Sequence, residues 1–100
     1  MWKKGSLIYP QELAEKVGQN RALVLAAVWS YSLMPEGYCF ASMESIAKRV
    51  VVSTITVRRA VGWLEREGYL TREHRGVHET DILTCSDEIT EHFNEYRNKR

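Results

Sequence analysis

Several features that identify common classes of protein are missing from this sequence of 100 residues. It has two cysteines, Cys39 and Cys85, which stand far apart and in no spacing typical of metal ligands. Residues 1–10 lack the apolar segment of a secretory signal peptide. The longest apolar run, residues 22–29, is far shorter than a membrane span. We therefore expect a cytoplasmic protein with no membrane partner and with free, buried thiols.

The motifs that support catalysis are also missing. We find no Ser-His-Asp arrangement and no glycine-rich loop of the kind that holds a phosphate. His74 and His78 flank an expected turn, and neither has a cysteine or carboxylate at ligand spacing, so we expect no metal site. The sequence thus predicts a protein that is not an enzyme and that has no cofactor and no small-molecule ligand.

Composition and charge describe what is present. A hydrophobic fraction of 44% and a charged fraction of 27% are typical of a globular chain, and the length suits a single domain, residues 1–100. The net charge is only +1, but it is unevenly distributed. Residues 42–76 hold seven basic and four acidic residues, whereas residues 77–100 hold three basic and six acidic ones. Such an asymmetry can orient a protein on a polyanion.

The order of expected elements indicates a mainly α fold with a small β-hairpin. Asn20, Ser42 and Ser53 are suitable N-caps, and Gly18 is a suitable C-terminal stop for a first short helix. Three helices followed by a hairpin give the layout of a winged helix. The sequence predicts helices at 10–17, 21–33, 43–49, 54–67 and 86–97 and strands at 38–41, 69–72 and 78–84.

The stretch from residue 42 to residue 67 meets the requirements of a helix-turn-helix. Ala47 supplies a small residue on the first helix, Val52 an apolar plug in the turn, and Ser53 a cap for the second helix. At 100° per residue, one side of that second helix is apolar. This apolar side consists of Val57, Ala60, Val61 and Leu64.

Together with the segments 46–49, 56–60 and 67–70, these residues resemble the winged helix-turn-helix domains of bacterial transcription regulators and of phage or plasmid replication initiators. The resemblance covers about residues 38–84, with a helix-turn-helix at about 42–67 and a wing at about 69–84. It implies a protein that binds double-stranded DNA, as a transcription regulator or a replication-initiation domain. The helix at about 54–67 would enter the major groove, and the wing would contact flanking backbone. The implied DNA-binding residues are Lys48, Arg49, Ser53, Thr54, Ile55, Thr56, Arg58, Arg59, Arg72, His74 and Arg75.

The sequence departs from this family's pattern in the turn and in the recognition helix. Val51 stands where the turn usually has glycine, and a β-branched residue is poorly suited to positive φ, so we expect a longer or differently shaped turn. Gly62 costs the helix about 1 kcal/mol relative to alanine. Trp63 lies at the edge of the outward face, where it would either cover the base of the wing or contact another protein.

A second function of a different class is compatible with the same fold. The domain would then be a protein-interaction module without DNA binding, a role that the modest net charge and the acidic tail favour. Its partner interface, or the interface of a homodimer, would use Trp63, Ile89 and Phe93. A third alternative is that the chain is a fragment of a larger replication protein.

Overall fold

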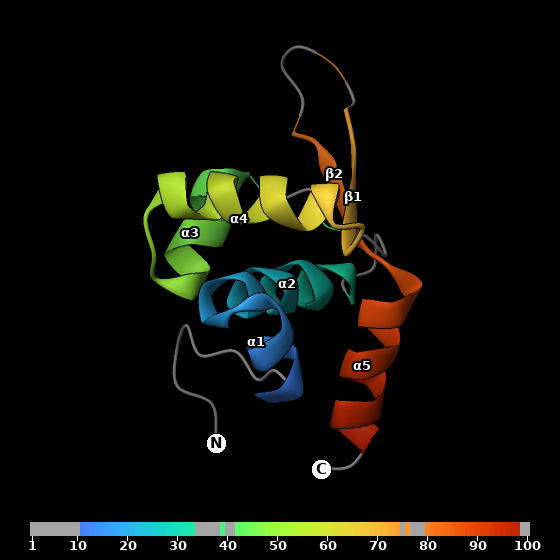
Figure 1. The fold of residues 1–100 in the computed structure, drawn as a ribbon. Helices are drawn as coiled ribbons and strands as arrows, with labels where there is room; N and C mark the ends of the chain where they lie inside the picture. The colour runs from blue at the N-terminus through green and yellow to red at the C-terminus, as the bar shows by residue number, and fades with distance from the viewer. Residues whose placement is uncertain (1–10, 34–38, 40–41, 75, 77–79, 99–100) are drawn as a thin grey trace.

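The fold is a helical core from which a two-stranded antiparallel wing projects (Figure 1). The structure is a computed structural model, and it describes residues 11–33, 39, 42–74, 76 and 80–98. The predicted mainly α class with a small hairpin is confirmed. The elements are α1 (Gln11–Val17), α2 (Gln19–Ser32), α3 (Met43–Val50), α4 (Thr54–Arg66), β1 (Leu70–Glu73), β2 (Ile82–Cys85) and α5 (Asp87–Asn98).

Helix α2 lies at the centre, with α4 and the wing on one side and α1 and α5 on the other (Figure 1). Its residues 24–28 are all buried, because apolar side chains surround this part of the helix. The helix begins two residues earlier than predicted. Its N-cap is Gly18, with φ 98°, and Asn20 already lies inside the first turn. Gly18 closes α1 through its N–H and opens α2 through its carbonyl, so one glycine with positive φ replaces a linker.

The helix-turn-helix forms as predicted at both of its N-caps. The Ser42 hydroxyl accepts a hydrogen bond from the Ser45 N–H, and the Ser53 hydroxyl accepts one from the Thr56 N–H, each at 3.1 Å. Each cap satisfies one of the backbone donors that a helix leaves unpaired at its first turn. The predicted starts of α3 and α4 are therefore confirmed.

The expectation of a longer turn before α4 is wrong. Val51 alone adopts the left-handed conformation, with φ 60° and ψ 50°, and the Val52 N–H returns to the Ala47 carbonyl at 3.1 Å. This is the single-residue helix ending that glycine usually makes. The Val51 side chain is 80% exposed, so the strain of a β-branched residue at positive φ is not accompanied by crowding in the core.

The wing pairs Leu70 with Cys85 and Glu73 with Ile82 in antiparallel register. The predicted hairpin is confirmed, with β1 one residue later than expected and β2 at its C-terminal part; His78 lies outside the described residues. Within the strand predicted at 38–41, Cys39 forms a bridge to Leu83, and the remaining residues lie outside the described ranges.

Helix α5 is attached through its apolar face. Ile89 is 0% exposed and Phe93 is 1% exposed, and the Phe93 ring stacks on Trp29 with 5.0 Å between ring centres. The prediction that Ile89 and Phe93 face a partner is therefore wrong, because both belong to the chain's own core. The periodicity that places them on one face was correct, but sequence cannot say which surface covers that face.

Both cysteines are free and buried, as predicted. Burial, together with a smaller effect of the neighbouring Cys39, raises the pKa of the Cys85 thiol to about 12. Among the described helices, none is both long enough and apolar enough to cross a bilayer.

Candidate nucleic-acid interface

Helix α4 presents one apolar and one polar face. The predicted stripe of Val57, Ala60, Val61 and Leu64 is buried against the core. This fixes the rotation of the helix about its axis. The face that remains in solvent carries Ile55, which is 62% exposed, together with Arg58 and Arg59.

The first turn of α4 holds no acidic residue. Its positive dipole end and its unpaired N–H groups are therefore not neutralised by the helix itself, which suits an anion. The Ser53 and Thr56 hydroxyls also bond to each other at 2.8 Å. That bond uses one of their two protons, so the pair retains one O–H to donate to a phosphate oxygen. The neighbouring Thr54 is half-buried.

The last turn of α3, which lies a few residues before the start of α4, adds two cations. Lys48 and Arg49 are both exposed. The Arg49 guanidinium lies 5.7 Å from the centre of the Tyr31 ring, a contact that restrains its side chain. With Arg58 and Arg59 of α4, these residues form a group of four exposed basic side chains, and Arg66 adds a fifth at the far end of α4.

The two arginines in the middle of α4 differ in their surroundings. An Arg58 Nη2 atom lies 3.5 Å from Glu44 on α3, an exposed pair that contributes little to stability. Arg59 makes no ion pair with any residue that the structure describes. It instead lines an open hollow of about 370 Å³, whose walls are residues 17–21 of the α1–α2 junction and Thr56, Arg59 and Ala60 of α4.

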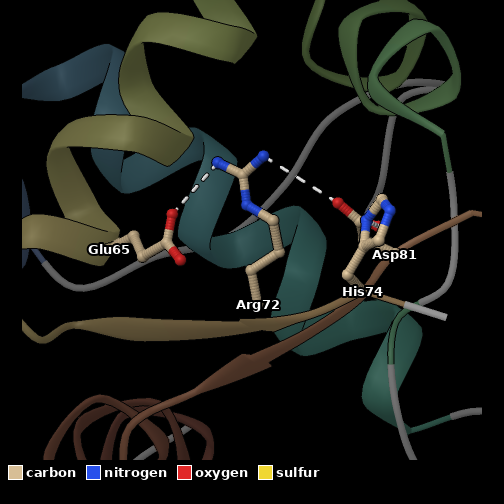
Figure 2. A network of polar contacts seen from close by, with 4 residues as sticks. All are labelled: Glu65, Arg72, His74 and Asp81. Atoms are coloured by element: carbon tan, nitrogen blue, oxygen red, sulfur yellow. Dashed lines mark hydrogen bonds and ion pairs between the residues drawn. The ribbon is translucent and has the colours of Figure 1, made fainter. Parts of the chain in front are cut away.

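The predicted wing residues are drawn into an internal network (Figure 2). Arg72 lies 3.1 Å from Glu65 of α4 and 3.9 Å from Asp81, and the His74 Nδ1 lies 2.7 Å from the other oxygen of Asp81. Only 30% of the Arg72 side chain is exposed. Its charge therefore ties the wing to α4 and is compensated by two carboxylates. Arg75, also predicted as a contact, lies outside the described residues.

Trp63 folds back toward the base of the wing. Its ring stacks on Tyr69 with 6.1 Å between centres, and the Arg21 guanidinium lies 4.0 Å from the ring centre. Lys16 extends this cluster, with its ammonium 5.4 Å from the Tyr69 ring centre and 2.7 Å from a Glu88 oxygen. That hydrogen bond raises the pKa of Lys16 and lowers the pKa of Glu88. The cluster joins α1, α2, α4 and α5 beside the wing.

Sequence reasoning missed the residues that surround the predicted contacts. Arg21 approaches α4 although about forty positions separate it from Trp63, and no local pattern brings such segments together. The carboxylates Glu65 and Asp81 were likewise not assigned to Arg72. These ion pairs depend on how the wing crosses α4, which no local sequence pattern gives. The described residues contain no group of three or more His, Cys, Asp or Glu side chains placed to hold a metal.

Comparison with known proteins identifies relatives of this arrangement. The sequence profile of a family described as a helix-turn-helix domain matches residues 13–70, more than half of the chain. Over an aligned length of 59 residues, which takes in 57% of this chain, the sequence is 41% identical to protein YmfN of Escherichia coli K12. The chain spans only 13% of that protein's length.

Solved structures share the fold at low sequence identity. MepR, a transcription regulator of the Staphylococcus aureus multidrug efflux pump MepA, superposes with a TM-score of 0.66 at 13% identity, over 89% of this chain and 62% of MepR. TubR from Bacillus thuringiensis, bound to 24 base pairs of tubC, superposes with a TM-score of 0.61 at 23% identity, over 93% of this chain and 100% of TubR.

Proposed function

Because this chain belongs to the helix-turn-helix domain family, we propose that it binds double-stranded DNA with α4 in the major groove. The observation that carries the proposal is the exposed face of α4. It combines two arginines and an exposed isoleucine with a capped N-terminus that holds no acid. Arginine can bind guanine or phosphate in a bidentate way, and an apolar side chain can contact a thymine methyl group.

The surrounding charges support this orientation. Lys48 and Arg49 end α3 where they would flank the same strand of DNA, and such contacts set affinity and register more than sequence preference. The exposed residues of α5 include Asp87, Glu88 and Glu91. This acidic helix starts at the base of the wing and runs away from α4 (Figure 1), so most of it would point away from the phosphates.

A biological role as a transcription regulator or as the DNA-binding part of a plasmid or phage protein is the finer proposal. MepR regulates transcription, and TubR was solved on plasmid DNA. Both roles require the same contact with duplex DNA, and no enzymatic step is proposed. Such a protein would work in the cytoplasm, where its two thiols stay reduced.

Binding to duplex DNA tests the proposal directly. We would titrate a fluorescein-labelled random-sequence duplex with the protein and follow anisotropy at several salt concentrations. The wild-type protein should bind at low salt, and its affinity should fall steeply as salt rises, because phosphate contacts release counterions. Absence of binding at low salt would contradict the proposed function.

Variants then locate the contact. The double variant Arg58→Ala/Arg59→Ala should weaken binding strongly, and each single variant should weaken it less. Lys16→Ala provides the control for net charge, since it removes one positive charge that is paired with Glu88 of α5 and is not on the exposed face of α4. Equal losses in Lys16→Ala and in Arg58→Ala would show that net charge, and not the α4 surface, governs binding.

A homodimer remains a prediction, and the structure changes where its interface would lie. Ile89 and Phe93 are buried, so of the surfaces predicted for an interface, the half-buried Trp63 and the exposed side of α5 are left for a second copy. That side of α5 is acidic in both copies, and like charges brought together are unfavourable. Sedimentation of the wild type and of Trp63→Ala, with and without DNA, tests whether Trp63 supports a dimer.

A further inference from the structure

The hollow between the α1–α2 junction and α4 has the properties of an anion site. It opens at the surface beside the first half of α4, the part that the proposed function places in the groove. No carboxylate is among its lining residues, whereas two of them, Arg21 and Arg59, carry guanidinium groups. An open cavity with two positive charges and no acid in its wall attracts a negatively charged group.

The two arginines are available to different degrees. Arg59 is exposed and makes no ion pair with any described residue, unlike Arg58, which faces Glu44. Arg21 uses one N–H for the Val17 carbonyl, at 3.1 Å, and rests on the Trp63 ring. A guanidinium carries five N–H donors, so Arg21 keeps donors for a ligand.

Arg21 is also held in place before any ligand arrives. Its contact with Trp63, at 4.0 Å from the ring centre, and its bond to Val17 restrict a long side chain that is otherwise mobile. Binding to a restrained group loses less conformational entropy than binding to a free one. Trp63 therefore has a structural contact with Arg21 and Tyr69, at a position for which the sequence alone left open a structural or a partner-binding role.

We propose that this hollow binds a backbone phosphate of the DNA, with Arg21 and Arg59 as its two guanidinium ligands. The inference rests on the proposed function, because α4 in the major groove brings a phosphodiester strand along the wall of that groove. A phosphate oxygen pair matches the two parallel N–H groups of a guanidinium. The site adds the α1–α2 junction to the DNA contact, outside the helix-turn-helix and the wing.

The salt dependence of binding is the measurement that separates a phosphate ligand from a residue that only supports the fold. Removing one phosphate contact should lower the slope of log affinity against log salt by about 1 and weaken binding equally on different sequences. Arg21→Gln and Arg59→Gln should each lower the slope, and the double variant should lower it by about 1 in total, because both side chains bind the same phosphate. Arg66→Gln, at the far end of the same helix, is the matched control and should leave the slope unchanged.

Arg21 also packs on Trp63, so a second variant leaves that contact intact. Asn20→Asp places a carboxylate in the wall of the hollow with almost no change of shape. A carboxylate in the first turn of α2 is favourable for the helix, so this variant should fold at least as well as the wild type. It should nevertheless bind DNA more weakly, with a reduced salt slope. Urea unfolding of every variant confirms that binding is compared between folded proteins.

The outcomes distinguish the two proposals. If the wild type does not bind duplex DNA at low salt, the proposed function fails, and the phosphate site with it. If the wild type binds but both Arg21→Gln and Asn20→Asp keep its slope and affinity, only the phosphate site is wrong. Inorganic phosphate, titrated without DNA while the tryptophan fluorescence of the wild type and of Trp63→Phe is followed, tests a free anion as the ligand. Saturable binding of free phosphate with an unchanged DNA slope in Arg21→Gln would overturn the assignment to the DNA backbone.

Discussion

Helices α4 and α5 both bury an apolar face, but their exposed faces differ in charge. Each buries an apolar stripe and begins at a serine, Ser53 for α4 and Ser86 for α5, whose hydroxyl accepts a backbone N–H at 3.1 Å and 3.3 Å respectively. Helix α4 then continues without an acid in its first turn, whereas α5 begins with Asp87 and Glu88. These two carboxylates already complement the dipole of α5.

The difference shows which part of an amphipathic helix carries function. The buried stripes of α4 and α5 explain stability equally well and say nothing of DNA. The two helices differ in the charge of their exposed faces. A helix N-terminus without acids and with arginines nearby attracts a polyanion, whereas an acidic N-terminus repels it. In Figure 1 the two helices lie on opposite sides of α2, so the molecule has one side suited to DNA and one that is not.

Phe93→Ala removes the buried contact that attaches α5 to the core, and it should have the largest effect on stability of the changes described here. The ring is 1% exposed and stacks on Trp29, so its removal should cost about 3–5 kcal/mol of unfolding free energy. Urea denaturation measures this loss. DNA affinity per folded molecule should stay unchanged, because α5 faces away from the proposed contact. A variant of normal stability with reduced DNA affinity would contradict this division of roles.

Ile55→Glu converts the start of α4 into a copy of the start of α5. The new carboxylate occupies the position that Glu88 holds in α5, the second residue of the helix. We expect unchanged or slightly higher stability from the dipole, and DNA affinity reduced by about tenfold or more from charge repulsion. Ile55→Gln is the control for lost apolar contact. Equal affinities of the two variants would show that no phosphate approaches this helix end.

Cys85, the last residue of β2, gives a prediction about how stability depends on pH. Below about pH 9 the Cys85 thiol is protonated in both the folded and the unfolded chain, so it adds no pH dependence. Between about 9 and the folded-state pKa of about 12, only the unfolded chain loses the proton, and stability falls as pH rises. The stability advantage of the wild type over Cys85→Ala should shrink by about 1.4 kcal/mol from pH 8 to pH 10. Urea unfolding at the two pH values measures it; an unchanged difference would mean that the thiol is not desolvated.

A substitution of Val51, in the turn before α4, should have the smallest effect on stability. Val51→Gly relieves the left-handed strain of a β-branched residue, at some cost in unfolded-chain entropy, and its exposed side chain loses no packing. We expect a gain of about 0.5–1 kcal/mol. Val51→Ala, which keeps the strain, should gain much less. Thermal unfolding of the three proteins tests whether the turn before α4 stores this energy.

Local rules explain what the sequence could predict. Caps at Ser42 and Ser53 and the stripe beginning at Val57 depend on neighbours a few positions away, and these elements start where expected. The start of α2 was placed two residues late because Gly18 was given one role, and in the structure it ends α1 and begins α2.

Tertiary contacts account for the features that the sequence could not predict. The covering of Phe93 by Trp29, the attachment of Arg72 to Glu65 and Asp81, and the approach of Arg21 to Trp63 all join segments distant in the chain. Whether a basic or apolar side chain is free for a ligand depends on these pairings. The candidate contact residues on α4 could therefore be proposed from sequence, and the hollow that adjoins them could not.

The bridge between Cys39 and Leu83 has a consequence for how the protein behaves at high concentration. The Leu83 N–H donates to the Cys39 carbonyl at 2.7 Å, on the side of β2 that β1 leaves open. A strand with unpaired backbone groups is a template for adding strands from other molecules. Here β2 is capped at its core end, and β1 is four residues long with charged Arg72 and Glu73 at its tip. The hairpin can thus project from the surface and still expose few strand-edge groups that could pair with a strand of another molecule.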